Sequence, residues 1–140
     1  MRTGNYILWA LLACIAYSFV PPLVRVGTRE IPSNVAAFIS NFVLLVITFA
    51  VLVYNSESLS PHVTSNGAIY LYLAGICLGV GILSYYRALE LGPVSIVVPI
   101  FAMFIVGGSV IGFVVLNEAV TARKVLGVIL GVVAIYLISV

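Results

Sequence analysis

Long apolar segments separated by short polar ones make up this sequence, and this alternation limits the chain to very few folds. Of the 140 residues, 64% are hydrophobic and only 7% are charged, and the charges cluster between the apolar segments. A helix of roughly 20 apolar residues crosses the hydrocarbon core of a bilayer. A soluble domain, in which about a quarter of the residues are normally charged, cannot hide this much apolar surface. The sequence therefore predicts an integral membrane protein.

Five apolar segments are long enough to cross the membrane. They predict an all-α fold, a polytopic bundle of five transmembrane helices, in a single domain over residues 1–140. The expected spans are residues 6–26, 35–54, 67–89, 94–116 and 121–140. We expect the first span to be retained, because it is too long for the apolar part of a cleaved signal peptide. An odd number of crossings places the two ends of the chain on opposite faces of the membrane.

Prolines interrupt two of the predicted helices. Pro21 and Pro22 should bend or break the first span, because proline lacks the N–H group and its ring clashes with the preceding turn. Pro99 removes the bond to the Ser95 carbonyl and could act as a hinge in the fourth span. Interrupted helices border the transport path in many transporters, although most prolines in membrane helices are tolerated kinks.

Candidates for a substrate path are polar or aromatic side chains within or beside the spans: Tyr17, Ser18, Asn41, Ser84, Tyr85 and Arg87. Asn41 lies midway along its span and either bonds to a neighbouring helix or faces a cavity and binds substrate. Tyr17 and Ser18 precede the two prolines by one turn and either pack beside a kink or border a cavity. Arg87 either pairs with Glu90, three residues along the same helix face, or attracts anions to the mouth of a cavity.

Small residues recur at a spacing that lets helix backbones approach closely. The pairs are Gly75 with Gly79, Gly108 with Gly112, and Gly127 with Gly131. All three pairs could serve packing within one chain, and we favour the last as a dimer contact because the fifth helix is terminal. Cys14 and Cys77 lie inside apolar spans, which favours small packing residues over a disulfide or a metal site. No metal site and no cofactor are predicted.

Positive charges are balanced between the two predicted faces of the membrane. One face holds Arg2, Arg123 and Lys124, and the other holds Arg25, Arg29 and Arg87. An excess of Lys and Arg in short loops sets orientation, so this balance leaves two interpretations. Either the N-terminus is cytoplasmic and Arg87 counts weakly, or the chain inserts both ways up. The second would let two copies pair antiparallel and form an inverted-topology repeat.

Local signals are also visible between the spans. Pro32-Ser33-Asn34 is suited to cap the second helix, and Thr121 is suited to cap the fifth. Residues 55–66 form the longest polar connection and contain His62.

An ordered set of motifs occupies the C-terminal part of the chain. It consists of Ala88–Ser95 (ALELGPVS), Pro99, Leu116-Asn117-Glu118, Thr121, and Gly127 through Gly131. This set resembles the EamA family of the drug/metabolite transporter superfamily, most of whose members carry two inverted five-helix repeats in one chain. This chain is similar to one half, and the resemblance implies a dimer with a substrate path between its halves. Glu118 matches the acidic position of the family; we expect it to cap the fifth helix beside Thr121, with a proton-coupling site as the alternative.

Together these features predict a secondary transporter that exports small metabolites or drugs. It would work as an antiparallel, dual-topology homodimer in the lipid bilayer; the alternative is a half-transporter or lipid-carrier flippase subunit that pairs with a different chain. The net charge of +2 and the lack of a basic run argue against nucleic acid. No phosphate-binding Gly-x-x-x-x-Gly-Lys loop supports ATP-driven transport. The only histidine lies outside the spans, which contain no Asp, so the chain is not predicted to be an enzyme. The resemblance implies a multi-pass protein of the plasma or inner membrane.

Overall fold

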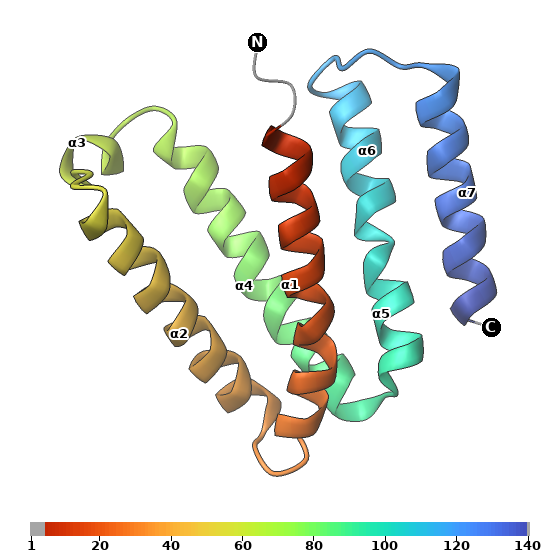
Figure 1. Ribbon diagram of the computed structural model, residues 1–140, viewed down its shortest axis with the longest axis horizontal. Coiled ribbons are helices and arrows are strands. Elements are labelled where there is room, and N and C mark those ends of the chain that lie inside the picture. Colours follow the sequence, from red (N-terminus) through yellow and green to blue (C-terminus); the bar gives the residue numbers. More distant parts are fainter. Residues whose placement is uncertain (1–4, 140) are drawn as a thin grey trace. The chain divides into compact units, whose positions relative to one another are not determined.

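The computed structural model describes residues 5–139, and over that range its regular structure is entirely helical (Figure 1). The helices are α1 (Asn5–Gly27), α2 (Ser33–Tyr54), α3 (Ser60–Val63), α4 (Ala68–Leu91), α5 (Val94–Ala102), α6 (Phe104–Val114) and α7 (Ala122–Ser139). The all-α prediction is confirmed. Arg2 and Val140, the last residue of the fifth predicted span, lie outside the described residues.

Four segments of the described chain are long and apolar enough to cross a membrane. They are Tyr6–Gly27, Ser33–Tyr54, Ala68–Leu91, and α5 with α6 over Val94–Val114. The fifth predicted span corresponds to α7, which covers 18 residues up to the end of the described chain. The five predicted spans therefore agree approximately with the structure, and apolar side chains project outward along these helices as expected of surfaces in lipid.

Pro21 and Pro22 are predicted to bend or break the first span, and a break is absent. α1 includes both Pro21 and Pro22 and continues to Gly27. Each proline removes only its own N–H bond, and the next turn is intact, because the Thr28 N–H donates to the Val24 carbonyl at 2.8 Å. The neighbouring helical bonds are enough to keep the helix continuous.

The fourth span is interrupted, but not at its proline. α5 passes through Pro99 and ends at Ala102, and Met103 separates it from α6. The Met103 N–H donates to the Ile100 carbonyl at 3.1 Å, three residues back instead of four. The predicted interruption is therefore present one turn after Pro99.

The helix caps agree with prediction in one case of three. Thr121 Oγ1 accepts the N–H of Lys124 at 3.3 Å and caps α7. α2 begins at Ser33 with Pro32 at its N-cap and without a side-chain cap bond, so the capping prediction for Ser33-Asn34 is wrong. The same is true of Glu118, whose Oε2 lies 3.9 Å from Lys124 Nζ instead of capping α7. The polar connection after α2 contains one helical turn, α3, that was not predicted.

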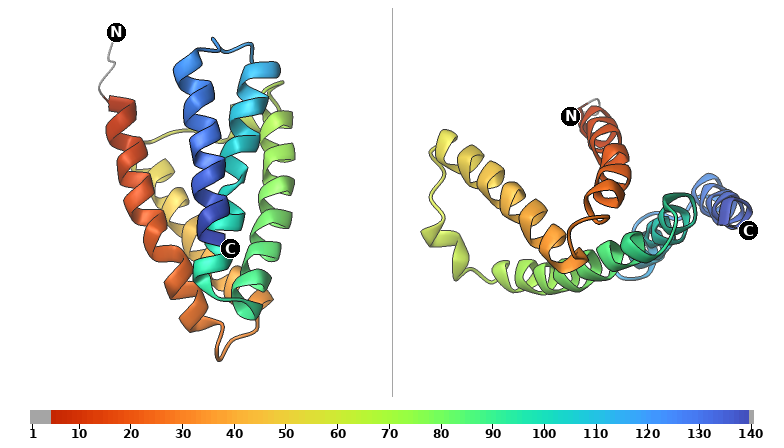
Figure 2. Two further views of the ribbon diagram at one scale, coloured as in Figure 1. Left: turned by 90° about the vertical axis from the view of Figure 1, so that its right-hand side faces the viewer. Right: turned by 90° about the horizontal axis from the view of Figure 1, so that it is seen from below.

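The chain divides into two compact units, one up to Glu90 and one from Leu91 onward. In the first unit, α1 ends, α2 begins and α4 ends at the same place (Figures 1 and 2). Apart from Ala68 at the start of α4, the buried apolar side chains gather around this place: Val24, Ala36, Ala37, Tyr85, Tyr86 and Leu89. In the second unit, α7 packs closely along α5 and more loosely against α6.

Candidate functional site

A side chain of α1 caps the C-terminal end of α4 in the first unit. Arg25 Nη1 donates to the carbonyl oxygens of Leu89 at 2.6 Å and of Glu90 at 2.7 Å. The last four carbonyl groups of an α-helix have no partner within the helix. The negative end of the helix dipole also favours a cation. Arg25, which the sequence analysis counted only as an orientation charge, therefore caps α4 from another helix.

Glu90 has the corresponding role at the start of α2. Its carboxylate accepts hydrogen bonds from the hydroxyl and the backbone N–H of Ser33, and from Arg87 Nη1 at 2.5 Å. Ser33 is the first residue of α2, where N–H groups have no helical partner, and its side chain is buried. Glu90 thus caps a helix that has no cap of its own, and the predicted Arg87–Glu90 ion pair is present.

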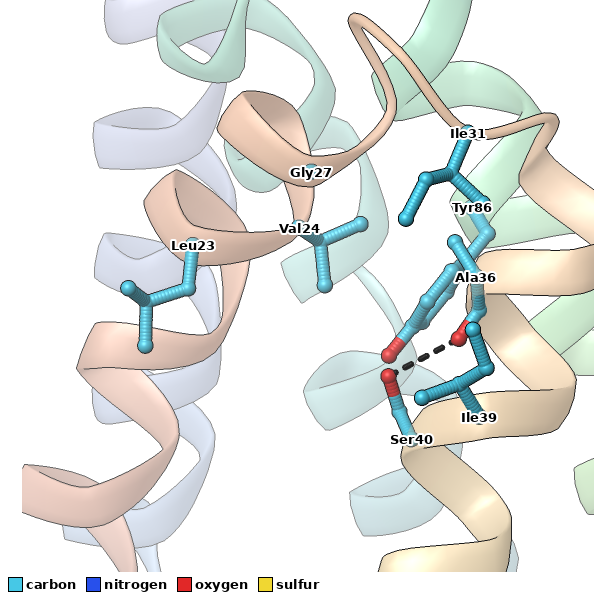
Figure 3. Close-up of a pocket in the computed structure, with 8 residues that line it drawn as sticks. All are labelled: Leu23, Val24, Gly27, Ile31, Ala36, Ile39, Ser40 and Tyr86. Carbon is cyan, nitrogen blue, oxygen red and sulfur yellow. Dashed lines mark hydrogen bonds between the residues drawn. The ribbon is translucent and has the colours of Figure 1, made fainter.

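A small cavity lies within the same unit (Figure 3). Its volume is about 190 Å³, and it is lined by Leu23, Val24, Gly27, Ile31, Ala36, Ile39, Ser40 and Tyr86. The lining is apolar except for two hydroxyl groups, and Ser40 Oγ donates to the Ala36 carbonyl at 2.9 Å. Pockets for drug-sized ligands usually measure about 300–1,000 Å³. This cavity can hold a small apolar group, but it is too small to be a complete site for a metabolite.

Three of the predicted path residues bond within their own helices. Ser18, Asn41 and Ser84 donate to the carbonyl four residues earlier, at 2.7, 2.8 and 2.8 Å respectively. The bond to a neighbouring helix predicted as one possibility for Asn41 is absent from the described part of the chain. The Asn41 side chain stays on an exposed face of α2, which keeps the second possibility, a wall of a substrate path, as a prediction.

The other three predicted path residues have different environments. Tyr17 is 71% exposed, whereas Tyr85 is 8% exposed and belongs to the core of the first unit. The Arg87 side chain is 60% exposed at the polar end of α4. The structure therefore brings Tyr85 and Arg87 to the same end of the unit but does not gather all six residues in one place.

Four of the predicted packing glycines line a groove in the second unit. Gly108 and Gly112 of α6 face Gly127 and Gly131 of α7 across a groove of about 710 Å³. A Cβ atom added to three of them would meet nothing within 4 Å, and at Gly112 it would meet only the Glu118 carboxyl group, at 3.5 Å. These pairs therefore make no close backbone contact within the described chain, and the dimer contact favoured for Gly127 and Gly131 stays a prediction.

The glycines of α4 and the two cysteines are open as well. Gly75 and Gly79 have nothing within 4 Å of an added Cβ atom, so they make no close helix contact in this chain. Cys14 and Cys77 are exposed thiols, so they do not pack inside it either. Contacts of these residues with a second copy remain a prediction.

Comparison with known proteins places these features in a family. The family model described as the EamA-like transporter family matches residues 4–140. A Sinorhizobium sp. protein, described as an uncharacterized transporter in the cobO 3′ region, is 29% identical over 121 residues, which make up 86% of each chain. Because the matched segment is about the same fraction of both, the two chains are similar in length. No solved structure matches the chain.

Proposed function

The chain belongs to the EamA-like transporter family, and from this premise we propose that it exports small metabolites or drugs as an antiparallel homodimer whose two copies insert in opposite orientations. It is a multi-pass membrane transporter by family and by its apolar helices. The proposal adds the substrate class, the direction of transport, the plasma membrane location and the dimer. The alternative, a subunit that pairs with a different chain, is separated from it by the experiment below.

The main support for insertion in two orientations is the balance of positive charge between the two predicted faces. Three Lys or Arg residues lie on each predicted face, so the rule that sets orientation has no excess to act on. The ion pairs do not alter this balance. Arg87 pairs with Glu90 on one face, and Lys124 lies beside Glu118 on the other. If these paired cations are left out, two Lys or Arg residues remain on each face.

The limited size of the first unit's cavity supports a second copy. Its 190 Å³ are lined almost entirely by apolar side chains, and the polar groups of Ser18, Asn41 and Ser84 bond within their own helices. Within residues 5–139, the first unit's cavity and these three side chains thus do not form an enclosed polar path. In transporters built from inverted repeats, the substrate site lies at the repeat interface near the bilayer midplane, and two antiparallel copies would provide such an interface.

Orientation is measured with single cysteines in a background in which Cys14 and Cys77 are replaced by Ala. Ser58→Cys reports on the connection between α2 and α4, and Glu30→Cys reports on the connection between α1 and α2. An impermeant thiol reagent applied to intact cells should label about half of each variant if insertion is dual. A matched variant that adds Glu57→Arg should shift the population toward copies that keep residue 58 inside.

One result would overturn the dual orientation. Complete labelling of one position from outside, with the other labelled only after permeabilisation, means a fixed orientation. The partner must then be a different chain inserted the opposite way, or a parallel copy.

A further inference from the structure

The groove between α6 and α7 lies outside the features that support the proposed function. Four glycines are among the residues that line it, and its lining along α7 runs from Lys124 to Ile135. At about 1.5 Å per residue, these eleven steps correspond to about 16 Å. The hydrocarbon core is about 30 Å thick, so the length of the groove along α7 is about the thickness of one leaflet. This length matches a single lipid acyl chain.

Two opposite charges lie at one end of the groove. Lys124 Nζ is 3.9 Å from Glu118 Oε2, with side chains that are 48% and 55% exposed. The ammonium group also donates to the Ala119 carbonyl at 3.0 Å and lies 5.8 Å from the centroid of the Phe113 ring. The Glu118 carboxyl group rests over Gly112, where a Cβ atom would be 3.5 Å away. One end of the groove therefore offers a cation and an anion side by side.

We propose that this groove binds one acyl chain of a phospholipid whose headgroup contains a primary amine. The lipid ammonium group lies against the Glu118 carboxylate, and the lipid phosphate lies against Lys124. The acyl chain covers the open faces of Gly127 and Gly131. Such a headgroup supplies an ammonium group for Glu118 and a phosphate group for Lys124. An anionic lipid without an amine has no group that can pair with Glu118.

A helix of a second copy, which the spacing of Gly127 and Gly131 predicts as a dimer contact, fits this end of the groove less well. Such a helix is about 10 Å wide with its side chains and would cover both charged groups, which removes them from water at a cost that needs compensation. A zwitterionic headgroup supplies the opposite charges itself. The groove length and the charge pair therefore point to the same occupant.

The test is native mass spectrometry of the full chain in detergent, titrated with phosphatidylethanolamine or phosphatidylglycerol of identical acyl chains. The amine lipid should bind about two- to fivefold more tightly, as expected of a partly exposed ion pair. Glu118→Gln, which preserves side-chain size, should abolish this preference. Gly127→Leu with Gly131→Leu should weaken the binding of both lipids at least about tenfold, because two leucines displace methylene groups from the groove.

A matched control uses Gly75→Leu with Gly79→Leu, which adds the same side chains to open positions on α4. Binding by this variant should stay within about twofold of the original protein, since these positions lie outside the groove. Equal affinity of the original protein for the two lipids, or a preference unchanged by Glu118→Gln, would overturn the proposal. So would efficient disulfide formation between copies of a Gly131→Cys variant, because the groove would then be covered by protein.

Discussion

Arg25 reaches from α1 to the carbonyl of Leu89, 64 residues further along the chain, at 2.6 Å. Leu89 is also fully buried, at 0% exposure. The hydrogen bond and the burial lie at the same end of α4, so the position of α4 against α1 depends on a charged and an apolar contact together.

Replacement of Arg25 should destabilise the first unit. Arg25→Ala removes bonds to two carbonyl groups at a partly buried site, and a bond to a charged group contributes about 1.5–3 kcal/mol. Arg25→Lys should recover part of the loss, because one ammonium group replaces a planar fork of donors. Unfolding by SDS in mixed micelles measures the change, and Arg29→Ala, an exposed neighbour, is the control. Equal effects of Arg25→Ala and Arg29→Ala would contradict the capping role.

The cap that Glu90 provides to α2 predicts an order among three substitutions. Ser33→Ala and Glu90→Gln should lower the unfolding midpoint more than Arg87→Ala, because Ser33 is buried whereas the Arg87 side chain is 60% exposed. The double variant Ser33→Ala with Glu90→Gln should cost less than the sum of the single ones, since both remove the same contact. Additive effects would show that the two residues act independently.

The interruption of the fourth span should be caused by the backbone conformation at Met103 and not by Pro99. Pro99 lacks the bond to the Ser95 carbonyl, whereas Met103 and Val106 donate to carbonyls only three residues back. Pro99→Ala should therefore leave amide hydrogen exchange over residues 103–107 unchanged while it adds a new, protected amide at residue 99. Mass spectrometry of deuterated peptides separates the two regions. Greater protection over residues 103–107 would identify Pro99 as the cause of the interruption.

Thr121→Ala should loosen the first turn of α7. Loss of an N-cap side chain usually costs about 0.5–2 kcal/mol, and the 3.3 Å separation from the Lys124 N–H suggests the lower end of that range. Faster amide exchange over residues 122–125 is the measurement. Thr64→Ala, outside the transmembrane helices, is the control and should leave that exchange unchanged. Unchanged exchange in Thr121→Ala as well would contradict the capping role.

Asn41→Leu separates packing from transport. Its amide nitrogen donates to the Ala37 carbonyl, which belongs to the same helix, so the unfolding midpoint should change little. A role in the path would appear as lost efflux of a fluorescent organic cation from proteoliposomes at equal folded protein. Val43→Leu, two residues later and therefore on the opposite face of α2, is the control for local effects.

The helices could be predicted well because apolar length and charge are local properties of the sequence. Most boundaries of the long helices lie close to where polar residues return, as at Thr28 after α1 and at Asn55 after α2. The Arg87–Glu90 pair and the Thr121 cap also depend on neighbours three residues away, so spacing alone indicates them. These features require no knowledge of how the helices are arranged.

The remaining parts of the site depend on contacts that spacing does not encode. Nothing near Arg25 indicates that its partners are the carbonyls of residues 89 and 90. The glycine spacing identified which helix faces are small, but not that two such faces would border a groove. At Pro21 and Pro22, the prediction of a break gave too much weight to two missing bonds in a helix that keeps the others.

The order of biosynthesis gives the contact between α1 and α4 a further consequence. Arg25 leaves the ribosome 64 residues before Leu89, and at about 5–20 residues per second this interval lasts roughly 3–13 s. During that time the guanidinium group has only water, lipid headgroups or the insertion machinery as partners. This contact can therefore form only after α4 has been synthesised, so the first unit cannot reach its final packing while only α1 and α2 have left the ribosome.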